Sequence, residues 1–224
     1  MMRVFLARAA RPSYTSEIMT SPDDLRLDFP ATRRNQDPIL EVLARVLPPE
    51  GLVLEVGSGS GQHVAAFAAG LPHLAWQASD PAPRHRASID AWARHAGLDL
   101  APALDLDVTR RPWPIERAAA VISVNMIHIA PWEACLGLLT GACGVLPEAG
   151  VLYLYGPFAV GGTHTADGNA RFDAALRAEN PDWGVRNLDD VALEARMRGL
   201  HLVETARMPA NNLSVIFRKR SGMA

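Results

Sequence analysis

A glycine-rich turn directly after an apolar run is the first feature of this sequence that could do chemistry. The run Leu52–Val56, broken only by Glu55, predicts a buried strand, and residues 62–69 predict a short helix. The turn between them reads Gly57, Ser58, Gly59, Ser60, Gly61. Glycines let the backbone approach a ligand closely, and a helix N-terminus offers free N–H groups. The turn therefore predicts a ligand-binding loop.

A carboxylate follows the next predicted strand. Asp80 ends the strand 74–79, about twenty residues beyond the glycines, which is the spacing of an acid that holds a ribose. Its side chain could accept both ribose hydroxyls of an adenosine. The alternative is an Asp-Pro turn, because Pro81 comes next.

A second acid, Asp107, follows a third short predicted strand at 100–104. Asp107 could accept a hydrogen bond from the exocyclic amine of adenine, while the backbone N–H of Val108 contacts the ring. The alternative is an acid in a solvated loop.

Elements of a doubly wound sheet must position these residues. Strands alternate with helices along most of the chain, which predicts βαβ units and a parallel sheet covered on both faces. The last two strands, 200–208 and 213–218, are separated by four residues, so they must form an antiparallel hairpin. The other expected strands are 119–124 and 150–156, and the other expected helices are 83–96, 131–143, 171–179 and 189–198. Residues 157–170 are expected to be a loop.

The first helix is expected to begin at Asp37 as the N-cap, with Pro38 at its first position. Arg34 and Asn35 then precede the helix, where they could fold over the cleft. An arginine there suits a ligand carboxylate, because its planar donors match that group. A solvent-exposed arginine is the alternative.

These motifs resemble those of class I S-adenosylmethionine (SAM)-dependent methyltransferases. The resemblance covers residues 50 to 220 and implies a single Rossmann-like α/β domain, with a mostly parallel seven-stranded sheet of order 3-2-1-4-5-7-6 and an antiparallel strand 7. It implies SAM as the cofactor and S-adenosylhomocysteine as the product. The residues expected to bind the cofactor are Arg34, Asn35, Glu55, Gly57, Ser58, Gly59, Gly61, Asp80, Asp107, Val108, Asn125 and Met126.

A narrower resemblance extends over nearly the whole chain beyond the first residues. It is to an uncharacterised methyltransferase-like family found in bacteria and animals, and it sharpens the fold more than the substrate. The segments that carry it are Arg33–Ile39, Asn125–Ile129, Tyr155–Phe158, Asn180–Arg186 and Met208–Asn212.

The fourth strand of such a fold ends at the floor of the cleft. Asn125 and Met126 lie there, beside the methyl group to be transferred. His128 follows closely and could act as a general base, since a histidine with a pKa near 6.5 can accept a proton at neutral pH. A capping or packed histidine is the alternative.

Three further residues are expected on the acceptor side. Tyr155 ends the fifth strand, and Trp183 and Arg186 lie in the tail, where class I enzymes elaborate a lid over the acceptor. A tryptophan packed in the core is the alternative for Trp183.

The composition bounds the partners. The formal net charge is −2, and Lys219 is the single lysine, so there is no basic field for nucleic acid. No apolar run is long enough for a bilayer span. Cys135 and Cys143 show no metal-binding spacing and suit a reducing cytoplasmic setting, and no metal is expected. The expected partner is a small-molecule acceptor, and the oligomeric state stays open.

The N-terminal residues depart from the rest of the chain. Arg3, Arg8 and Arg11 occur with no acid before Glu17, and the apolar piece between them is too short for a secretory signal. We expect residues 1–24 to be a disordered leader or the result of a misassigned start, and residues 25–224 to form the methyltransferase domain.

Other functions remain as alternatives to methyl transfer. A non-catalytic SAM-binding or interaction module is one, because methyl transfer needs no unmistakable catalytic residue. An NAD(P)-dependent oxidoreductase is another, although Gln62 stands where the dinucleotide motif expects its third glycine. A nucleic-acid methyltransferase would need an Asn-Pro-Pro-Tyr or Asn-Pro-Pro-Phe motif after the fourth strand, and this chain lacks it.

Overall fold

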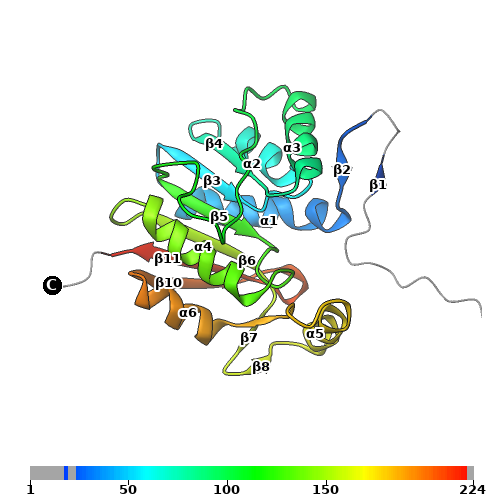
Figure 1. The fold of residues 1–224 in the computed structure, drawn as a ribbon, viewed down its shortest axis with the longest axis vertical. Coiled ribbons are helices and arrows are strands. Elements are labelled where there is room, and N and C mark those ends of the chain that lie inside the picture. The colour runs from blue at the N-terminus through cyan, green and yellow to red at the C-terminus, as the bar shows by residue number, and fades with distance from the viewer. Residues whose placement is uncertain (1–17, 20–23, 221–224) are drawn as a thin grey trace, which may run out of the picture.

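The computed structural model describes residues 18–19 and 24–220 and is built around a six-stranded sheet (Figure 1). The strand order is β10-β11-β6-β5-β3-β4. Apolar residues fill the four inner strands, as expected for a sheet buried on both faces, whereas the edge strand β10 is largely exposed. The strands are β3 (Leu52–Val56), β4 (Ala75–Ser79), β5 (Ala120–Val124), β6 (Val151–Gly156), β10 (Leu200–Arg207) and β11 (Leu213–Lys219).

The predicted antiparallel hairpin is confirmed. Strands β3, β4, β5 and β6 run parallel, whereas β11 pairs antiparallel with both β6 and β10. The predicted seven-stranded order is wrong in one respect, because the strand expected at 100–104 is reduced to one isolated bridge between Ser79 and Leu104. Pro102 has no N–H to donate to a ladder, and its carbonyl accepts the Gln77 side-chain amide at 2.9 Å instead.

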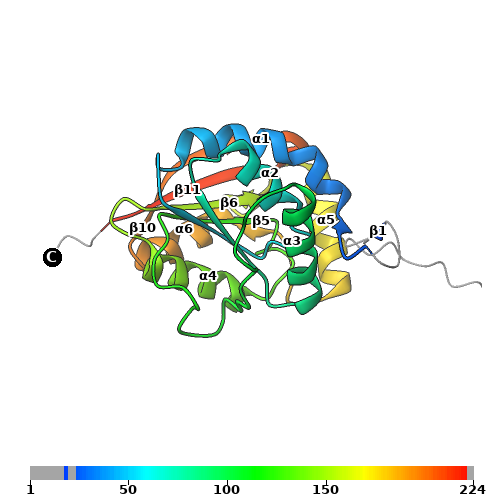
Figure 2. The ribbon, with the colours of Figure 1, turned by 90° about the horizontal axis from the view of Figure 1, so that it is seen from above.

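Five of the six α-helices among the described residues cover the two faces of the sheet, and α5 lies at its end (Figure 1). Figure 2 shows α1 and α2 on one face and α4 and α6 on the other. The side chains alternate accordingly: Val53 and Ile122 pack toward α1 and α2, and Leu54 and Val121 pack toward α4. The helices are α1 (Pro30–Val46), α2 (Gln62–Gly70), α3 (Pro83–His95), α4 (Trp132–Val145), α5 (Asp167–Glu179) and α6 (Leu188–Met197).

Helix α1 begins eight residues earlier than expected, with Pro30 rather than Pro38 as its first residue. Pro30 stands at the first helical position, where its missing N–H is not needed. Pro38 lies inside the helix, where it removes one backbone hydrogen bond, and buried Ile39 and Leu43 hold the helix to the core on its far side. Residues 34 and 35 are therefore helical rather than part of a preceding segment.

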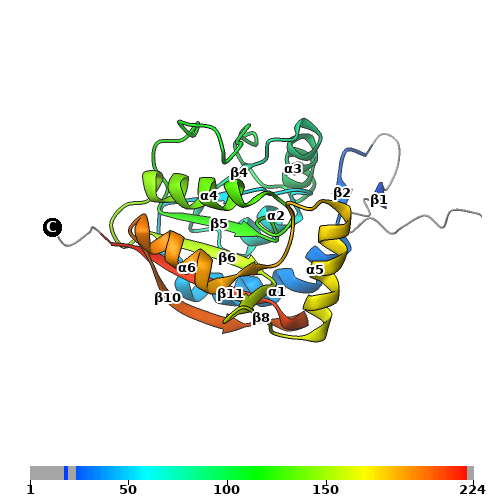
Figure 3. The same cartoon turned by 60° about the horizontal axis from the view of Figure 1, so that its bottom comes forward.

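The expected loop at 157–170 is also corrected. Residues Phe158–Val160 (β7) and Thr163–His164 (β8) form a hairpin, and β7 pairs in parallel with Arg186–Asn187 (β9). Gly161 and Gly162 both have positive φ, which suits a two-residue hairpin turn. Figures 1 and 3 show this small sheet between α6 and α5, and a short 3-10 helix, Pro209–Asn211, joins β10 to β11.

The N-terminal part begins with a small hairpin. Strand β1 (Ile18–Met19) pairs antiparallel with β2 (Leu27–Asp28). Of the predicted leader 1–24, only residues 18, 19 and 24 are among the described residues. The leader and the domain boundary at 25 therefore remain predictions. In the described ranges, no helix combines the length and apolarity of a membrane span.

Candidate functional site

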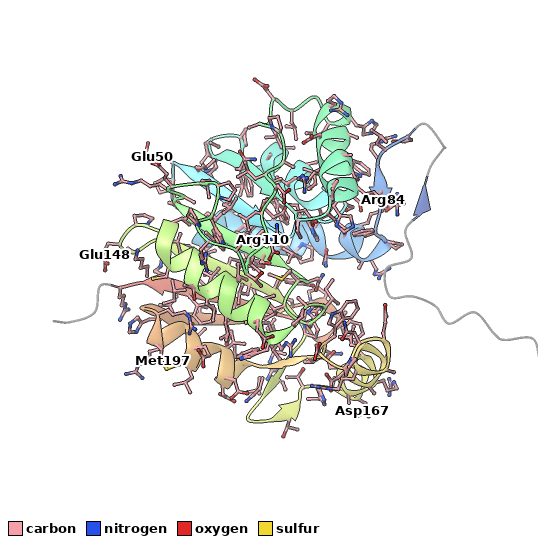
Figure 4. The ribbon with its side chains drawn as sticks, in the orientation of Figure 1. Glu50, Arg84, Arg110, Glu148, Asp167 and Met197 are labelled. Atoms are coloured by element: carbon pink, nitrogen blue, oxygen red, sulfur yellow. The ribbon has the colours of Figure 1, made fainter. Side chains whose placement is uncertain are left out.

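The candidate site lies where the parallel strands end. In Figure 4, Arg84 in the first turn of α3 and Asp167 at the start of α5 lie on the right, whereas Glu148, shortly before β6, lies on the left. Strand β6 therefore runs toward the side of Arg84 and Asp167, and the strands parallel to it end on that side as well. Ligands of doubly wound sheets bind at this carboxyl edge.

The glycine turn requires glycine for its backbone and its packing. Gly57, Gly59 and Gly61 have φ of +70°, +56° and +88°. A Cβ on Gly57 would lie 3.0 Å from the Cγ of Met126, and a Cβ on Gly61 would lie 2.5 Å from the Cα of Ile89 in α3. Gly61 is therefore explained by the close approach of a neighbouring helix.

Gly59 connects the turn to the predicted ribose acid. Its backbone N–H donates to Oδ2 of Asp80 at 3.0 Å. A Cβ on Gly59 would lie 3.1 Å from the ring of Phe29, which precedes α1. The turn and the acid thus form one hydrogen-bonded unit, with an aromatic ring against it.

Asp80 forms the predicted Asp-Pro turn, and one of its oxygens could still accept a further hydrogen bond. Its Oδ1 accepts the N–H of Ala82 at 2.9 Å, which is the expected Asp-Pro turn, and lies 3.1 Å from Nδ1 of His85. The residue is 5% exposed. Since a carboxylate oxygen can accept about two hydrogen bonds, Oδ2 retains capacity for a ligand hydroxyl beside the Gly59 amide. Ribose binding remains a prediction.

Glu55 is the unusual charge of the site. It is 1% exposed, and among the described residues its Oε2 has no hydrogen-bond partner. Burial raises its pKa to about 8; a hydrogen bond from Ser58 opposes this shift, and the negative charge of Asp80 adds to it. Because burial disfavours an isolated negative charge, such a carboxyl either keeps its proton or pairs with a cation from a ligand.

Asp107 is engaged locally. Its Oδ1 accepts the hydroxyl of Thr109 at 2.7 Å and the backbone N–H of Thr109 at 2.9 Å, which lowers the pKa of the carboxyl. Its Oδ2 lies 3.3 Å from Nε of Arg110. This is the geometry of a loop acid. Val108 is buried in the core on the α4 side. A role for either residue in holding adenine remains a prediction.

The end of β5 carries a strained backbone position. Asn125 has φ of +56°, an uncommon value for a residue with a side chain, and its N–H donates to the carbonyl of Tyr155 at 2.8 Å. Such positions concentrate at binding sites. The strain turns the chain sharply between the strand and the segment that carries Met126 and His128.

His128 is buried at this point. It is 3% exposed, and within the described part of the chain its Nδ1 has no hydrogen-bond partner. Burial lowers its pKa to about 3, with the charge of Arg186 adding to the shift. The ring is therefore neutral at physiological pH.

Segments that are distant in the sequence surround the His128 ring. A Cβ on Gly156 would lie 3.1 Å from its Cε1, so the ring rests against the glycine that ends β6. The ring of Phe172 in α5 meets it edge-on, with centroids 5.6 Å apart. The N–H of Gly184 donates to the His128 carbonyl at 3.0 Å.

Arg186 holds the segment after β5 in place. Its guanidinium donates to the carbonyls of Ile127 at 3.0 Å, Ala130 at 2.5 Å and Asp182 at 2.9 Å. It also lies over the ring of Trp132. These contacts stabilise the local structure. Trp183 is half-buried in the segment between α5 and β9. Contact of either residue with an acceptor remains a prediction.

Two predicted residues meet in a polar network between α1 and the sheet. Asn35 Oδ1 lies 2.8 Å from Nε2 of His63 in α2, and Asn35 also bonds to the hydroxyl of Tyr155. That hydroxyl accepts the side-chain amide of Asn212 at 3.1 Å. Arg34, by contrast, is exposed on α1.

The sequence did not reveal several residues of the site. Phe29, His85 and Phe172 contact predicted residues across long stretches of chain, and no local motif marks them. Gly156 lies within the segment Tyr155–Phe158 that carries the narrower resemblance, and its position at the end of a strand is the sequence feature that indicates a place in the site.

The chain has an α/β fold with a mostly parallel six-stranded sheet, and solved methyltransferases share this fold. The chain belongs to the family described as protein of unknown function (DUF938), which its sequence matches over residues 27–219. An uncharacterised family was expected, and its spread across bacteria and animals remains a prediction.

Solved structures with this fold share little sequence with the chain. An O-methyltransferase family protein from Burkholderia thailandensis is similar with a TM-score of 0.71 and 18% identity, covering 86% of this chain and 58% of that one. An O-methyltransferase family 2 protein from Planctomyces limnophilus, solved with apigenin, has a TM-score of 0.73 and 19% identity, covering 84% of this chain and 58% of that one. Human N-acetylserotonin methyltransferase, solved with SAM, has a TM-score of 0.71 and 14% identity, covering 85% of this chain and 53% of that one. The chain spans little more than half the length of these proteins.

Proposed function

We propose that this protein binds SAM at the glycine turn and transfers its methyl group to a small-molecule acceptor. The observation that carries the proposal is the buried carboxyl of Glu55 near Asp80, whose Oε2 has no hydrogen-bond partner among the described residues. The methyltransferase fold supports it, as does the human structural neighbour, which was solved with SAM.

The two carboxylates match two groups of SAM. The amino group of its methionine part is a cation that would give Glu55 Oε2 the missing partner, and its ribose hydroxyls suit Asp80. The other proposed cofactor contacts are Arg34, Asn35, Asp107, Val108, Asn125 and Met126. When bound, SAM supplies a methyl group already activated by the positive sulfur, so the chain has to align the acceptor and exclude water.

A dinucleotide fits this turn less well. NAD(P) places a pyrophosphate at the glycine turn, where it needs N–H donors and positive charge. Here the Gly59 N–H is bonded to Asp80, and the carboxyl of Glu55 lies beside the turn. The negative charge of Asp80 and that of a pyrophosphate, brought together in a site shielded from water, would repel each other strongly.

We assign His128 to orienting the acceptor. A neutral ring with an unpartnered, buried Nδ1 suits a hydrogen bond to an acceptor hydroxyl or amine. A pKa near 3 makes it a weak proton acceptor at neutral pH, because general bases work best when their pKa is near the working pH. The His128–Phe172 contact and the net charge of −2 favour a small organic acceptor over nucleic acid.

Calorimetric titration of SAM at pH 6.5, in buffers of different ionisation enthalpy, tests the proposal. Glu55 carries its proton at pH 6.5 in the free protein, since its pKa is about 8. An ammonium group needs the carboxylate, so binding should release about one proton, and affinity should fall about tenfold per pH unit below 8.

The matched control is Glu55→Gln, which keeps the side-chain size. It should bind SAM more weakly, release no proton and lose the pH dependence below 8. Tight binding of NADH with no response to SAM would exclude the proposal.

A second measurement separates an enzyme from a non-catalytic binding module. The protein is incubated with SAM and a metabolite extract, and mass spectrometry searches for products one methyl group heavier. Tight SAM binding without any such product across extracts would favour the binding module.

A further inference from the structure

The segment Asp24–Phe29, which we name the N-terminal strap, is fixed to α2 and α3. The Leu27 N–H donates to the Ser88 hydroxyl at 2.8 Å, and that hydroxyl donates to the Ser60 carbonyl at 2.6 Å in the glycine turn. The Trp92 indole N–H donates to the Leu27 carbonyl at 2.8 Å. Two of these three bonds are buried, which makes the strap part of the fold around the turn.

The side chain of Gln62 joins the strap to the turn a second time. Its Oε1 accepts the Phe29 N–H at 2.8 Å and the Ser60 hydroxyl at 2.9 Å. Its Nε2 donates to Asp28 at 3.0 Å, and Asp28 also pairs with Arg33 of α1. Gln62 is the first residue of α2, so one amide holds both the strap and the start of the helix.

This anchoring places the Phe29 ring beside the ribose acid. The ring edge lies where a Cβ on Gly59 would be 3.1 Å away. It meets the ring of His85 edge-on, with centroids 6.1 Å apart, and His85 Nδ1 lies 3.1 Å from Asp80. Phe29 is half-buried, so part of its ring remains accessible. The two residues that the Phe29 ring approaches, Gly59 and His85, both lie within hydrogen-bond distance of Asp80.

We propose that Phe29 and His85 form the wall of the ribose pocket, and that the strap closes the cofactor site from outside the sheet. This rests on the proposed function, and it adds contact residues that precede α1 and lie in α3. An aromatic ring at this position packs on the sugar and keeps water from the hydrogen bonds to Asp80. Those bonds are stronger in a site of low dielectric.

Hydrogen exchange of the wild-type chain, with and without S-adenosylhomocysteine, gives the first test. The amides of Leu27 and Phe29 donate to side chains of α3 and α2, so a ligand resting on the ring should slow exchange in residues 27–33. Residues 57–61 and 80–86 should slow as well. Protection at 57–61 and 80–86 without protection at 27–33 would overturn the strap proposal and leave the proposed function intact. Protection in neither region would overturn both.

Affinity measurements give the second test. Phe29→Ala should weaken binding of S-adenosylhomocysteine about tenfold, and Phe29→Tyr should retain it, because an aromatic ring remains. Leu25→Ala is the control within the strap, since Leu25 is 57% exposed, and it should change affinity less than twofold. Equal affinities for Phe29→Ala and wild type, with both folded by circular dichroism, would overturn the proposal.

Discussion

The two halves of the site are built in different ways. The donor half, with the glycine turn and Asp80, is joined by backbone groups: the Gly59 amide and the Ala82 amide both donate to one carboxylate. In the proposed acceptor half, the His128 ring packs against Gly156 and the ring of Phe172, and a backbone hydrogen bond from Gly184 holds the His128 carbonyl. Backbone geometry tolerates little change, whereas packed side chains can be exchanged. This difference suits a site that keeps one cofactor while its acceptor varies.

Two glycines make the contrast concrete. A Cβ on Gly61 would meet the backbone of α3 at Ile89, which cannot move without the helix. A Cβ on Gly156 would meet the ring of His128, a side chain. Gly61 is therefore needed for the close packing of α3, whereas Gly156 leaves space for the His128 ring.

The largest effect is expected from Gly61→Ala. The new Cβ would lie 2.5 Å from the Cα of Ile89, at a φ of +88°. Overpacking together with an unfavourable φ should lower the free energy of unfolding by about 3 kcal/mol or more. Urea denaturation measures the change. Gly97→Ala is the matched control: its φ is +67°, and nothing lies within 4 Å of the added Cβ. It should cost about 1–2 kcal/mol, and equal losses would contradict the packing argument.

The next effect belongs to the acceptor half. His128→Ala should lower kcat about a hundredfold while SAM affinity changes little, because we propose that the ring orients the acceptor. Steady-state kinetics on the identified acceptor, paired with calorimetry, separate the two quantities. Since the pKa of His128 is lowered to about 3, the ring is neutral from pH 9 down to 6, and its titration should leave kcat flat there. A parallel loss of stability and SAM affinity, with kcat retained, would show that the ring only packs.

A smaller effect separates the two acids of the donor half. Asp80→Ala should weaken SAM binding about ten- to a hundredfold, by removing a charge-assisted contact to the ribose. It also removes the acceptor of the Gly59 and Ala82 amides, so some loss of stability is expected as well. Asp107→Ala should change affinity only a few-fold, because Thr109 and Arg110 already engage that carboxyl. Equal losses of affinity for the two variants would contradict this ranking.

The donor half was predictable because its signals are local. Glycines after an apolar strand and an acid at the end of the next strand both follow from short stretches of sequence, and the structure joins Gly59 to Asp80. The antiparallel hairpin was predictable for a similar reason, since four residues cannot hold a crossover helix.

The rest depends on contacts between distant residues. The surroundings of His128 come from positions 156, 172 and 184, and no spacing rule connects them. Pro38 predicts the start of a helix, because a proline inside a helix removes one backbone hydrogen bond. In α1, the packing of Ile39 and Leu43 outweighs that loss, so the helix starts earlier. The hairpin at 158–164 was taken for a loop, although Gly161 and Gly162 allow its turn.

The single bridge at Leu104 also affects whether two copies of this protein can pair through the edges of their sheets. A sheet edge exposes unpaired N–H and C=O groups that can capture a strand from a second molecule. At the β4 edge, the irregular segment that contains Pro102 occupies that position and offers no continuous ladder. At the other edge, β10 has a register shift between Leu202 and Glu204, which twists the strand. Both edges of the sheet are thereby made poor templates for aggregation.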